Sequence, residues 1–465
     1  MLGGEIMLKK LLLFMGKKGG SLSMYDFIIA SLAIEAMFNN TGKKGYEVLK
    51  KLLGHEDNRI RELAIEGIGF ALRESGNQEV VDVLQRILIP KHVDKYVHMA
   101  AAEAMGLILR GRDDAIECFK PHLEIENGEL RSNILRGLSL AYQGSCDKDI
   151  LDTLKRQIKV GRKLDAWELV VIWAIIGIGL VCRGVGDYTL LRIIKPYLKF
   201  RYEVFRAAAA YASALIFEGT GNEYILDLIK PLFYDFTEVR TAAAISTYIL
   251  FKNYGEEAVR KLSPLTRHRN WAAYVATAFG LGSALRGTGN EEATNIVKKF
   301  LKSSSDDARA LTGLALADLY NKLGDKVYDE LLEMIEKGNE DEAGWAIYTM
   351  GSAYEATKRE DILETLTRLY NPGWFWAYGY RDDAIRLAIG KLFRGSKDQS
   401  VLERGLRLSP EALLKNPWFF KEHAIVLAMA NILAESMPQE YWRAILYRTR
   451  QFGEKFWGMH LPIFY

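Results

Sequence analysis

Few cysteines occur in the sequence, and their arrangement does not suit a metal or redox site. Cys118, Cys146 and Cys182 are odd in number, widely spaced and contain no CxxC pair. Such a set argues against thiolate metal binding and against a redox-active pair. We therefore expect three reduced cysteines that pack as small apolar residues, which places the protein in the cytoplasm.

A membrane-spanning segment is also missing. The most apolar run, residues 169–182, contains fourteen residues without a charge, whereas a membrane helix needs about 18 or more. We expect this run to form a helix that is buried on all sides. A secretory signal peptide needs an apolar stretch of about 7–15 residues and a cleavage site. Because the apolar run at 11–15 is shorter, we expect residues 1–23 to form an N-terminal arm or cap.

Neither sign of charge predominates. The 465 residues include 62 Lys and Arg and 59 Asp and Glu, which gives a formal net charge of +3. A dedicated nucleic-acid-binding protein concentrates positive charge on one face. The near balance favours protein partners of unknown identity, with nucleic acid as the less favoured alternative.

Catalytic and metal-binding motifs are absent from the sequence as well. None of the seven histidines forms an HExxH motif or a His/Cys cluster. His98 and His423 occupy similar positions in predicted helices, but neither is followed by the glutamate that a His-Glu ligand pair would need. Paired carboxylates such as Asp113-Asp114 lie at helix starts, where capping explains them. We predict a non-enzymatic protein without a metal or cofactor.

A repeat of 34 or 35 residues organises the chain. Residues 206–235 and 271–303 share one plan, in which an alanine-rich helical segment, a Gly-Thr-Gly-Asn turn and a second helical segment follow one another. A fixed period of this size is typical of a helical solenoid. The turn glycines are Gly42, Gly76, Gly111, Gly186, Gly221, Gly255, Gly289 and Gly324, with a degenerate turn near Cys146.

The turn residues explain why each repeat contains two helices. Glycine favours the left-handed backbone conformation that ends a first helix. An Asn or Asp follows and can accept hydrogen bonds from the free N–H groups of the second helix. The predicted caps are Asn77, Asp113, Asp187, Asn222, Asn290 and Asp325. Because a helix precedes each turn, the glycines do not match a dinucleotide-binding loop, which follows a strand.

Prolines recur within the second helical segments. Pro121, Pro196 and Pro231 lie ten residues after their turn glycine, and Pro264 lies nine residues after Gly255. Because proline removes a backbone donor and clashes with the preceding turn, we expect each second helix to end or bend there. The first segments are rich in alanine instead, which lets neighbouring helices approach closely.

These features together resemble a known repeat family. The alanine-rich first segments, the Gly-Thr-Gly-Asn turn and the sequence ILDLIKPLF at 225–233 are similar to the proteasome/cyclosome (PC) repeat. That repeat is a relative of the HEAT repeat and occurs in the non-ATPase scaffold subunits of the proteasome regulatory particle. The resemblance is strongest over residues 96–324. It implies an all-α, armadillo-like fold, an α-solenoid of about 11–12 helix-turn-helix repeats that forms a curved horseshoe or a closed toroid.

The repeats divide the chain into three predicted parts. Residues 24–340 form the repeat array after the arm at 1–23, and residues 341–465 form degenerate, aromatic-rich repeats and a C-terminal cap. Within the last part, residues 371–381 interrupt the pattern with the aromatic and arginine residues that are enriched at protein interfaces. The candidate protein-binding residues are Trp374, Phe375, Trp376, Tyr378, Tyr380 and Arg381. A packed cap that shields the last repeat is the alternative interpretation.

Basic residues gather in two places. One candidate patch contains Lys155, Arg156, Lys159, Arg162 and Lys163, and the other contains Arg267, His268 and Arg269. Each patch is either a solvated face or a contact for an acidic partner or nucleic acid.

The leading hypothesis is a cytoplasmic, non-enzymatic scaffold for protein–protein interaction or complex assembly. A nucleic-acid-binding HEAT-like protein that uses the first basic patch is the alternative. A HEAT-like enzyme, such as a hydroxylase or glycosylase, is a third possibility.

Overall fold

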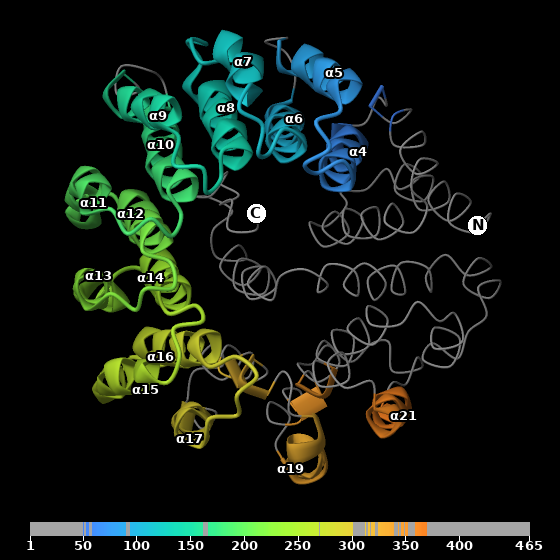
Figure 1. The fold of residues 1–465 in the computed structure, drawn as a ribbon, viewed down its shortest axis with the longest axis vertical. Coiled ribbons are helices and arrows are strands. Elements are labelled where there is room, and N and C mark those ends of the chain that lie inside the picture. Colours follow the sequence, from blue (N-terminus) through green and yellow to red (C-terminus); the bar gives the residue numbers. More distant parts are fainter. Residues whose placement is uncertain are drawn as a thin grey trace, which may run out of the picture. The chain divides into compact units, whose positions relative to one another are not determined.

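The chain folds into pairs of helices, as the repeat predicts. The computed structural model describes residues 58–89, 94–160, 166–268, 270–300, 324–338 and 359–369, together with 50, 53, 54 and isolated positions between 312 and 351. These residues form helices and turns, and no strand occurs among them (Figure 1). The protein is an all-α solenoid of HEAT-like repeats. It divides into two compact units, one over 1–199 and 414–428 and the other over 200–413 and 429–465.

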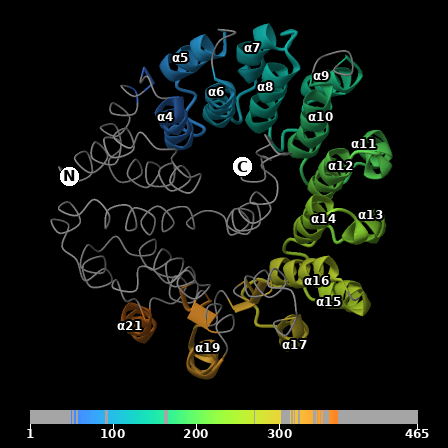
Figure 2. The ribbon, with the colours of Figure 1, turned by 180° about the vertical axis from the view of Figure 1, so that it is seen from behind.

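In unit 1, first and second helices alternate along the chain and form two layers (Figures 1 and 2). Each first helix packs against the next first helix, from α4 through α6 and α8 to α10. The first helices are α4 (Asn58–Ala71), α6 (Lys95–Ile108), α8 (Gly128–Ala141) and α10 (Trp167–Val181). The second helices are α5 (Gln78–Leu88), α7 (Ala115–Phe119), α9 (Lys148–Val160) and α11 (Tyr188–Ile194).

Unit 2 repeats this arrangement. Its first helices α12 (Glu203–Ile216), α14 (Thr237–Leu250) and α16 (Trp271–Ala284) pack in succession. The second helices are α13 (Glu223–Ile229), α15 (Glu257–Leu262) and α17 (Glu291–Phe300), and α19 (Gly324–Lys337) and α21 (Glu360–Leu369) follow later in the chain.

The turns between the two helices of a repeat adopt the predicted left-handed conformation. Gly76, Gly111, Gly186, Gly221, Gly255 and Gly289 all have positive φ. Except at Gly186, their N–H groups donate to the next repeat: Gly221 N donates to Leu250 O at 2.8 Å and Gly289 N to Leu319 O at 3.1 Å. The turn glycine therefore ends one helix and also joins two repeats.

The capping predictions are confirmed at four positions. The side chains of Asn77, Asp187, Asn222 and Asn290 each accept a hydrogen bond from an N–H in the first turn of the following helix. Two predicted caps are wrong. The residue before α7 is Asp114 rather than Asp113. Asp325 lies inside α19, because that helix begins at Gly324 itself, so Gly324 is not a left-handed turn residue.

Each recurrent proline changes the type of helix, as predicted. After α7, α11, α13 and α15 the chain tightens into short 3-10 helices, η1 (Lys120–His122), η3 (Lys195–Lys199), η4 (Lys230–Tyr234) and η5 (Ser263–Arg267). Pro121, Pro196, Pro231 and Pro264 are the second residues of these segments. The missing N–H of proline cannot continue the α-helical pattern, so the second helices stay short.

The first helices form the core of each unit. In α10, every residue from Val170 to Val181 is buried, which confirms the prediction of a helix buried on all sides. Neighbouring first helices approach closely where small residues meet: a Cβ added at Gly137 would lie 2.2 Å from the carbonyl oxygen of Ala102. None of the helices in the described ranges is long and apolar enough to cross a membrane.

The prediction of three reduced cysteines is wrong. Cys146 and Cys182 form a disulfide, with 4.4 Å between their Cα atoms, and Cys118 is free and half-buried. Cys146 lies in the turn after α8, where other repeats carry the second turn glycine, and it has a φ of +49°. Its N–H binds Val181 O, which brings it beside the end of α10 and so next to Cys182.

Several predictions concern parts of the chain outside the described residues. These are the arm at 1–23, the turn at Gly42 and nearly all of the aromatic-rich segment 341–465. The division into these three parts remains a prediction.

Candidate protein-interaction surface

The glycine-rich turns are occupied by contacts between repeats and do not form an anion site. In the turn after α12, Gly219 N donates to Ile249 O and Gly221 N to Leu250 O. The turn after α16 does the same through Gly287 and Gly289. A phosphate-binding loop needs free N–H groups that converge on one point. These N–H groups already have acceptors, so the turns have a structural role.

The first basic patch is only partly described. Arg156 and Lys159 lie exposed on α9. Lys155 donates a hydrogen bond to Asp152 one turn earlier, at 3.1 Å. Arg162 and Lys163 lie outside the described residues. The described part of the patch therefore offers two exposed cations without an acid partner among the described residues and a third that is already paired.

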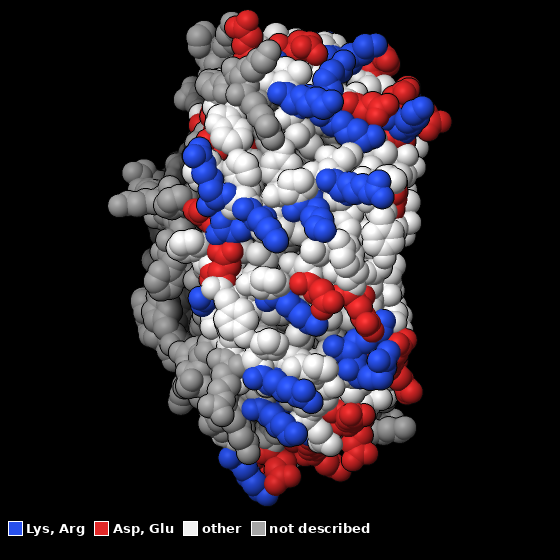
Figure 3. Space-filling model, turned by 90° about the vertical axis from the view of Figure 1, so that its left-hand side faces the viewer, with Lys and Arg blue, Asp and Glu red and all other residues white. Residues whose placement is uncertain are grey.

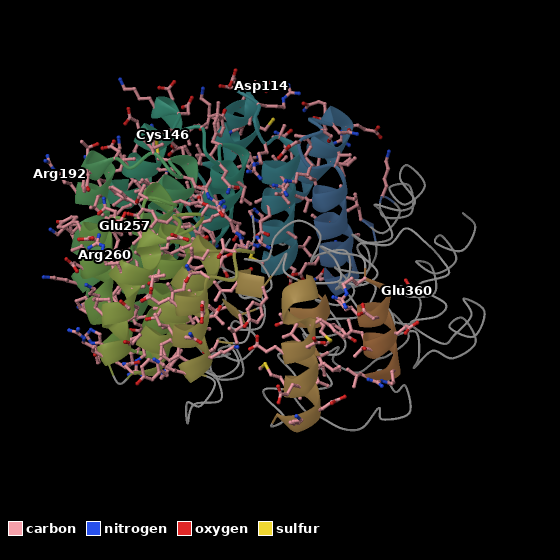
Figure 4. All side chains as sticks on the ribbon, turned by 60° about the horizontal axis from the view of Figure 1, so that its bottom comes forward. Asp114, Cys146, Arg192, Glu257, Arg260 and Glu360 are labelled. Carbon is pink, nitrogen blue, oxygen red and sulfur yellow. A yellow bond between two sulfur atoms is a disulfide. The ribbon has the colours of Figure 1, made fainter. Side chains whose placement is uncertain are left out.

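Charges of both signs are mixed on the surface. On the face that Figure 3 shows, Lys and Arg lie among Asp and Glu and among many uncharged side chains. Close pairs account for part of this pattern, such as Arg260 and Glu257 on α15, whose side chains are 2.5 Å apart and lie together in Figure 4. The arrangement agrees with the nearly balanced composition.

Two exposed aromatic residues lie in the segment that leads into α14. Tyr234 is 56% exposed and Phe236 is 65% exposed. The Tyr234 hydroxyl lies 2.5 Å from Nδ1 of His268, and the two rings meet edge to face with 5.9 Å between their centroids. Exposed rings of this size are costly to leave in water, and aromatic residues are enriched at the centres of protein interfaces.

The same register recurs one repeat earlier. Counting back 34 residues from Tyr234 and Phe236 gives Phe200 and Tyr202. The guanidinium of the exposed Arg201 lies 4.4 Å from the Tyr202 ring centroid, which is a cation–π geometry. Aromatic residues thus occupy equivalent positions in two successive loops of unit 2. We call Arg201, Tyr202, Tyr234, Phe236 and His268 the loop ridge.

An ion pair ties two of these loops together. The guanidinium of Arg206 on α12 donates to both carboxylate oxygens of Asp235, at 2.7 and 2.5 Å, and also to the carbonyl of Phe200 at 2.7 Å. Burial by itself raises the pKa of Asp235. The bonds from Arg206 and the Phe236 N–H, with the charges of Arg206 and Arg240, outweigh burial and hold this pKa below its ordinary value.

Unit 1 contains a cluster of polar side chains that is buried and therefore cannot contact a binding protein. Glu103 on α6 forms an ion pair with Arg136 on α8, and both side chains are almost fully buried. The guanidinium of Arg136 lies 4.8 Å from the ring centroid of Trp173 on α10. His98 and Asn133 lie beside one another nearby. The described residues include no group of three or more His, Cys, Asp and Glu side chains placed to hold a metal ion.

The predicted site residues have different outcomes. Trp374, Phe375, Trp376, Tyr378, Tyr380 and Arg381 lie outside the described residues, so they stay a prediction. In the second basic patch, Arg267 is exposed and His268 contacts Tyr234. The sequence interpretation missed the loop ridge. Aligning the loops at the repeat length would have revealed it, because Tyr202 and Phe236 lie 34 residues apart.

Comparison with known proteins agrees with the helical pairs. Residues 46–139 match the HEAT repeat family. The chain is 24% identical over 289 residues to the 26S proteasome regulatory subunit RPN2 of Candida glabrata, which covers 59% of this chain and 30% of that protein. It is 27% identical over 205 residues to the 26S proteasome non-ATPase regulatory subunit 1 of Caenorhabditis elegans, covering 43% and 20%. The predicted resemblance to HEAT-like and PC repeats is confirmed.

The similarity is limited in extent. The alignment with RPN2 of Eremothecium gossypii, at 27% identity, covers 47% of this chain and 23% of the relative. The chain therefore spans well under half the length of these relatives. Among solved structures, the crystal structure of Kap121p is 12% identical, with 96% of this chain and 51% of that chain covered and a TM-score of 0.37.

Proposed function

We propose that this protein is a non-enzymatic scaffold that binds other proteins through surfaces of its repeat array. One observation carries the proposal: unit 2 holds two large aromatic side chains, Tyr234 and Phe236, exposed in the loop before α14, on a framework whose turn glycines bind the next repeat. A rigid framework with exposed aromatic loops is typical of protein-binding surfaces. The similarity to repeats of proteasome regulatory subunits supports the same class of function.

Affinity purification tests this proposal directly. The tagged chain would be isolated from its native organism after mild cross-linking, and co-purifying proteins would be identified by mass spectrometry. We expect one or a few proteins in near-stoichiometric amounts. Recovery of the chain alone, in the presence and absence of cross-linker, would contradict the scaffold role. Deleting 371–381 in a parallel sample tests whether the predicted aromatic interruption takes part.

The proposed location is the cytoplasm. The disulfide removes one argument for it, namely the expectation that all three cysteines are reduced. Stable disulfides are rare in most cytoplasms but are common in those of hyperthermophiles. Alkylating thiols in intact cells before lysis would trap the native state of Cys146 and Cys182. A disulfide that is present in rapidly quenched cytoplasmic extract supports this location, whereas recovery of the chain only from extracellular or periplasmic fractions contradicts it.

A further inference from the structure

The exposed side of α11 carries two cations at positions where other second helices carry an ion pair. In α7, α9 and α13 an acid lies six residues after the turn glycine, or after Cys146, and pairs with the lysine three residues later, with 2.7–3.6 Å between nitrogen and oxygen. The pairs are Glu117–Lys120, Asp152–Lys155 and Asp227–Lys230. Six residues after Gly186, α11 carries Arg192 instead, and Lys195 follows. A second cation therefore replaces the acid of this pair.

The cations of α11 and η3 lie on one exposed stripe. Tyr188, Arg192, Lys195 and Lys199 follow one another at intervals of four, three and four residues, and residues at these intervals share one side of a helix. All four are exposed, Tyr188 by 48%, whereas the leucines of this segment are buried. The side chain of Arg192 extends from the surface in Figure 4. Because residues 188–199 contain no Asp or Glu, the segment supplies no acid of its own to balance these charges.

The preceding second helix, α9, adds two exposed cations, Arg156 and Lys159. In Figures 1 and 2, α9 and α11 are successive second helices of unit 1. Hydrogen bonds from the side chain and the N–H of Thr189 hold the pKa of Asp187, the cap of α11, below its ordinary value, and the charge of Lys155 on α9 adds to this shift. The charges of α9 therefore act on the start of α11. We call Arg156, Lys159, Arg192, Lys195 and Lys199 the α9–α11 basic face.

We propose that the α9–α11 basic face binds an acidic segment of a protein partner. Carboxylates of the segment pair with the cations of the two helices, and an apolar side chain of the segment covers the Tyr188 ring. This inference rests on the proposed scaffold function and names a binding site and the chemistry of its partner. Nucleic acid fits less well, because the exposed Asp149 and Asp152 lie on α9 with its cations. A row of phosphates has no group that could pair with these acids, whereas a protein segment can carry basic or polar residues among its own acids.

Peptide selection tests the proposal. A phage-displayed library of random dodecapeptides would be selected on the full-length chain, and the enriched peptides would be synthesised with a fluorescein label. We expect peptides rich in Asp and Glu to be enriched, and their affinity to fall as salt is added. Fluorescence polarisation should show at least about tenfold weaker binding to Arg192→Asp/Lys199→Glu, because each substitution turns an attraction into a repulsion. Replacing the acids of the peptide with Asn or Gln should weaken binding similarly.

Arg86→Asp/Lys299→Glu is the matched control. Arg86 on α5 and Lys299 on α17 are exposed and lie outside the basic face, and the control changes the net charge by the same amount. It should change the affinity by less than about twofold, as for surface charges in general. We expect the test variant to fold, because Arg192→Asp restores the acid–lysine pair that α9 and α13 contain. Circular dichroism would verify that all variants are folded.

A second variant, Arg156→Glu/Lys159→Glu, tests the α9 side of the face in the same assay, with the same expected loss. The proposal is overturned if no acidic peptide is enriched, if neither face variant weakens binding, or if the control weakens it equally. Displacement of the peptide by oligothymidylate whose own binding needs the face would also overturn it, in favour of nucleic acid.

The two face variants would also be used in the affinity purification. Loss of the partners that the wild type and the control retain supports the site. If the face variants retain these partners, the proposed site is wrong while the scaffold function stands. If the wild type retains no protein, the scaffold function itself fails.

Discussion

Single residues show how little freedom the close packing of first helices leaves. Gly137 on α8 faces the backbone of α6, and an added Cβ would lie 2.2 Å from Ala102 O. Because a backbone atom cannot rotate away, the helices would have to separate. This position requires glycine for space, whereas the turn glycines require it for conformation.

We therefore expect Gly137→Ala to lower the free energy of unfolding by about 1–3 kcal/mol. Thermal melting followed by circular dichroism is the measurement. Gly144→Asn is the control, because nothing lies within 4 Å of a Cβ there, its φ is +80°, and asparagine tolerates that conformation. Equal melting temperatures for Gly137→Ala and wild type would show that the helices are not in close contact at this point.

His98 predicts a dependence of stability on pH. Burial lowers the pKa of His98 to about 4; a backbone contact with Leu88 opposes this shift and the nearby His122 adds to it. Between pH 6.5 and 4 the unfolded chain binds a proton at this histidine that the folded chain does not, so stability falls as the pH falls. Going from pH 7 to 5 should cost about 2 kcal/mol through this residue.

The measurement compares the wild type with His98→Gln at pH 7 and at pH 5. Titrating groups far from His98 contribute equally to both proteins, so the difference between the two losses reports His98 together with its coupling to His122. We expect the variant to lose less stability on acidification. The same loss in both proteins would mean that His98 reaches solvent or titrates normally.

At the scale of secondary-structure elements, the features that the sequence predicts correctly are those that depend on residues close by in the chain. Left-handed glycines, Asn and Asp caps and proline-induced 3-10 segments were predicted residue by residue, because each depends on neighbours within a few positions. The wrong prediction of a cap at Asp325 shows where this local information is insufficient. Asp325 has the right spacing for a cap, but α19 begins one residue before it, and helix starts depend on contacts that spacing does not show.

Contacts between repeats were harder to predict. The disulfide joins Cys146 and Cys182, which are 36 residues apart, close to one repeat length. Composition alone suggested reduced thiols, since it contains no information about which residues become neighbours. The loop ridge was difficult to predict for the same reason, because Tyr234 and His268 come into contact only after successive repeats have packed. The repeat length is the one sequence signal that could have indicated both.

The disulfide and the turn that carries it can be separated by two substitutions. Cys146→Ser removes the disulfide and should cost about 2–4 kcal/mol. Cys146→Gly also removes it but suits the φ of +49°, which costs a residue with a side chain about 1 kcal/mol. We expect Cys146→Gly to melt at a higher temperature than Cys146→Ser under reducing conditions. The reverse order would show that the left-handed conformation is maintained only by the disulfide.

At the scale of the whole molecule, the distribution of charge decides between protein and nucleic-acid partners. The net charge of +3 is spread over a 465-residue chain. In the basic patch on α9, Lys155 is already bonded to Asp152, so Arg156 and Lys159 remain as the exposed cations without an acid partner among the described residues. Each phosphate contact lowers the logarithm of the affinity by about 0.9 per tenfold rise in salt.

Two such contacts predict a weak interaction with a shallow salt dependence. We expect a random 30-base-pair DNA duplex to bind only at low salt, with a slope of about −2, and to dissociate at physiological ionic strength. Filter binding across a salt series measures this slope, with Lys155→Glu/Arg156→Glu/Lys159→Glu as the comparison. A slope of about −5 or steeper that this triple variant abolishes would make nucleic acid the principal partner, because only several simultaneous phosphate contacts release that many counterions.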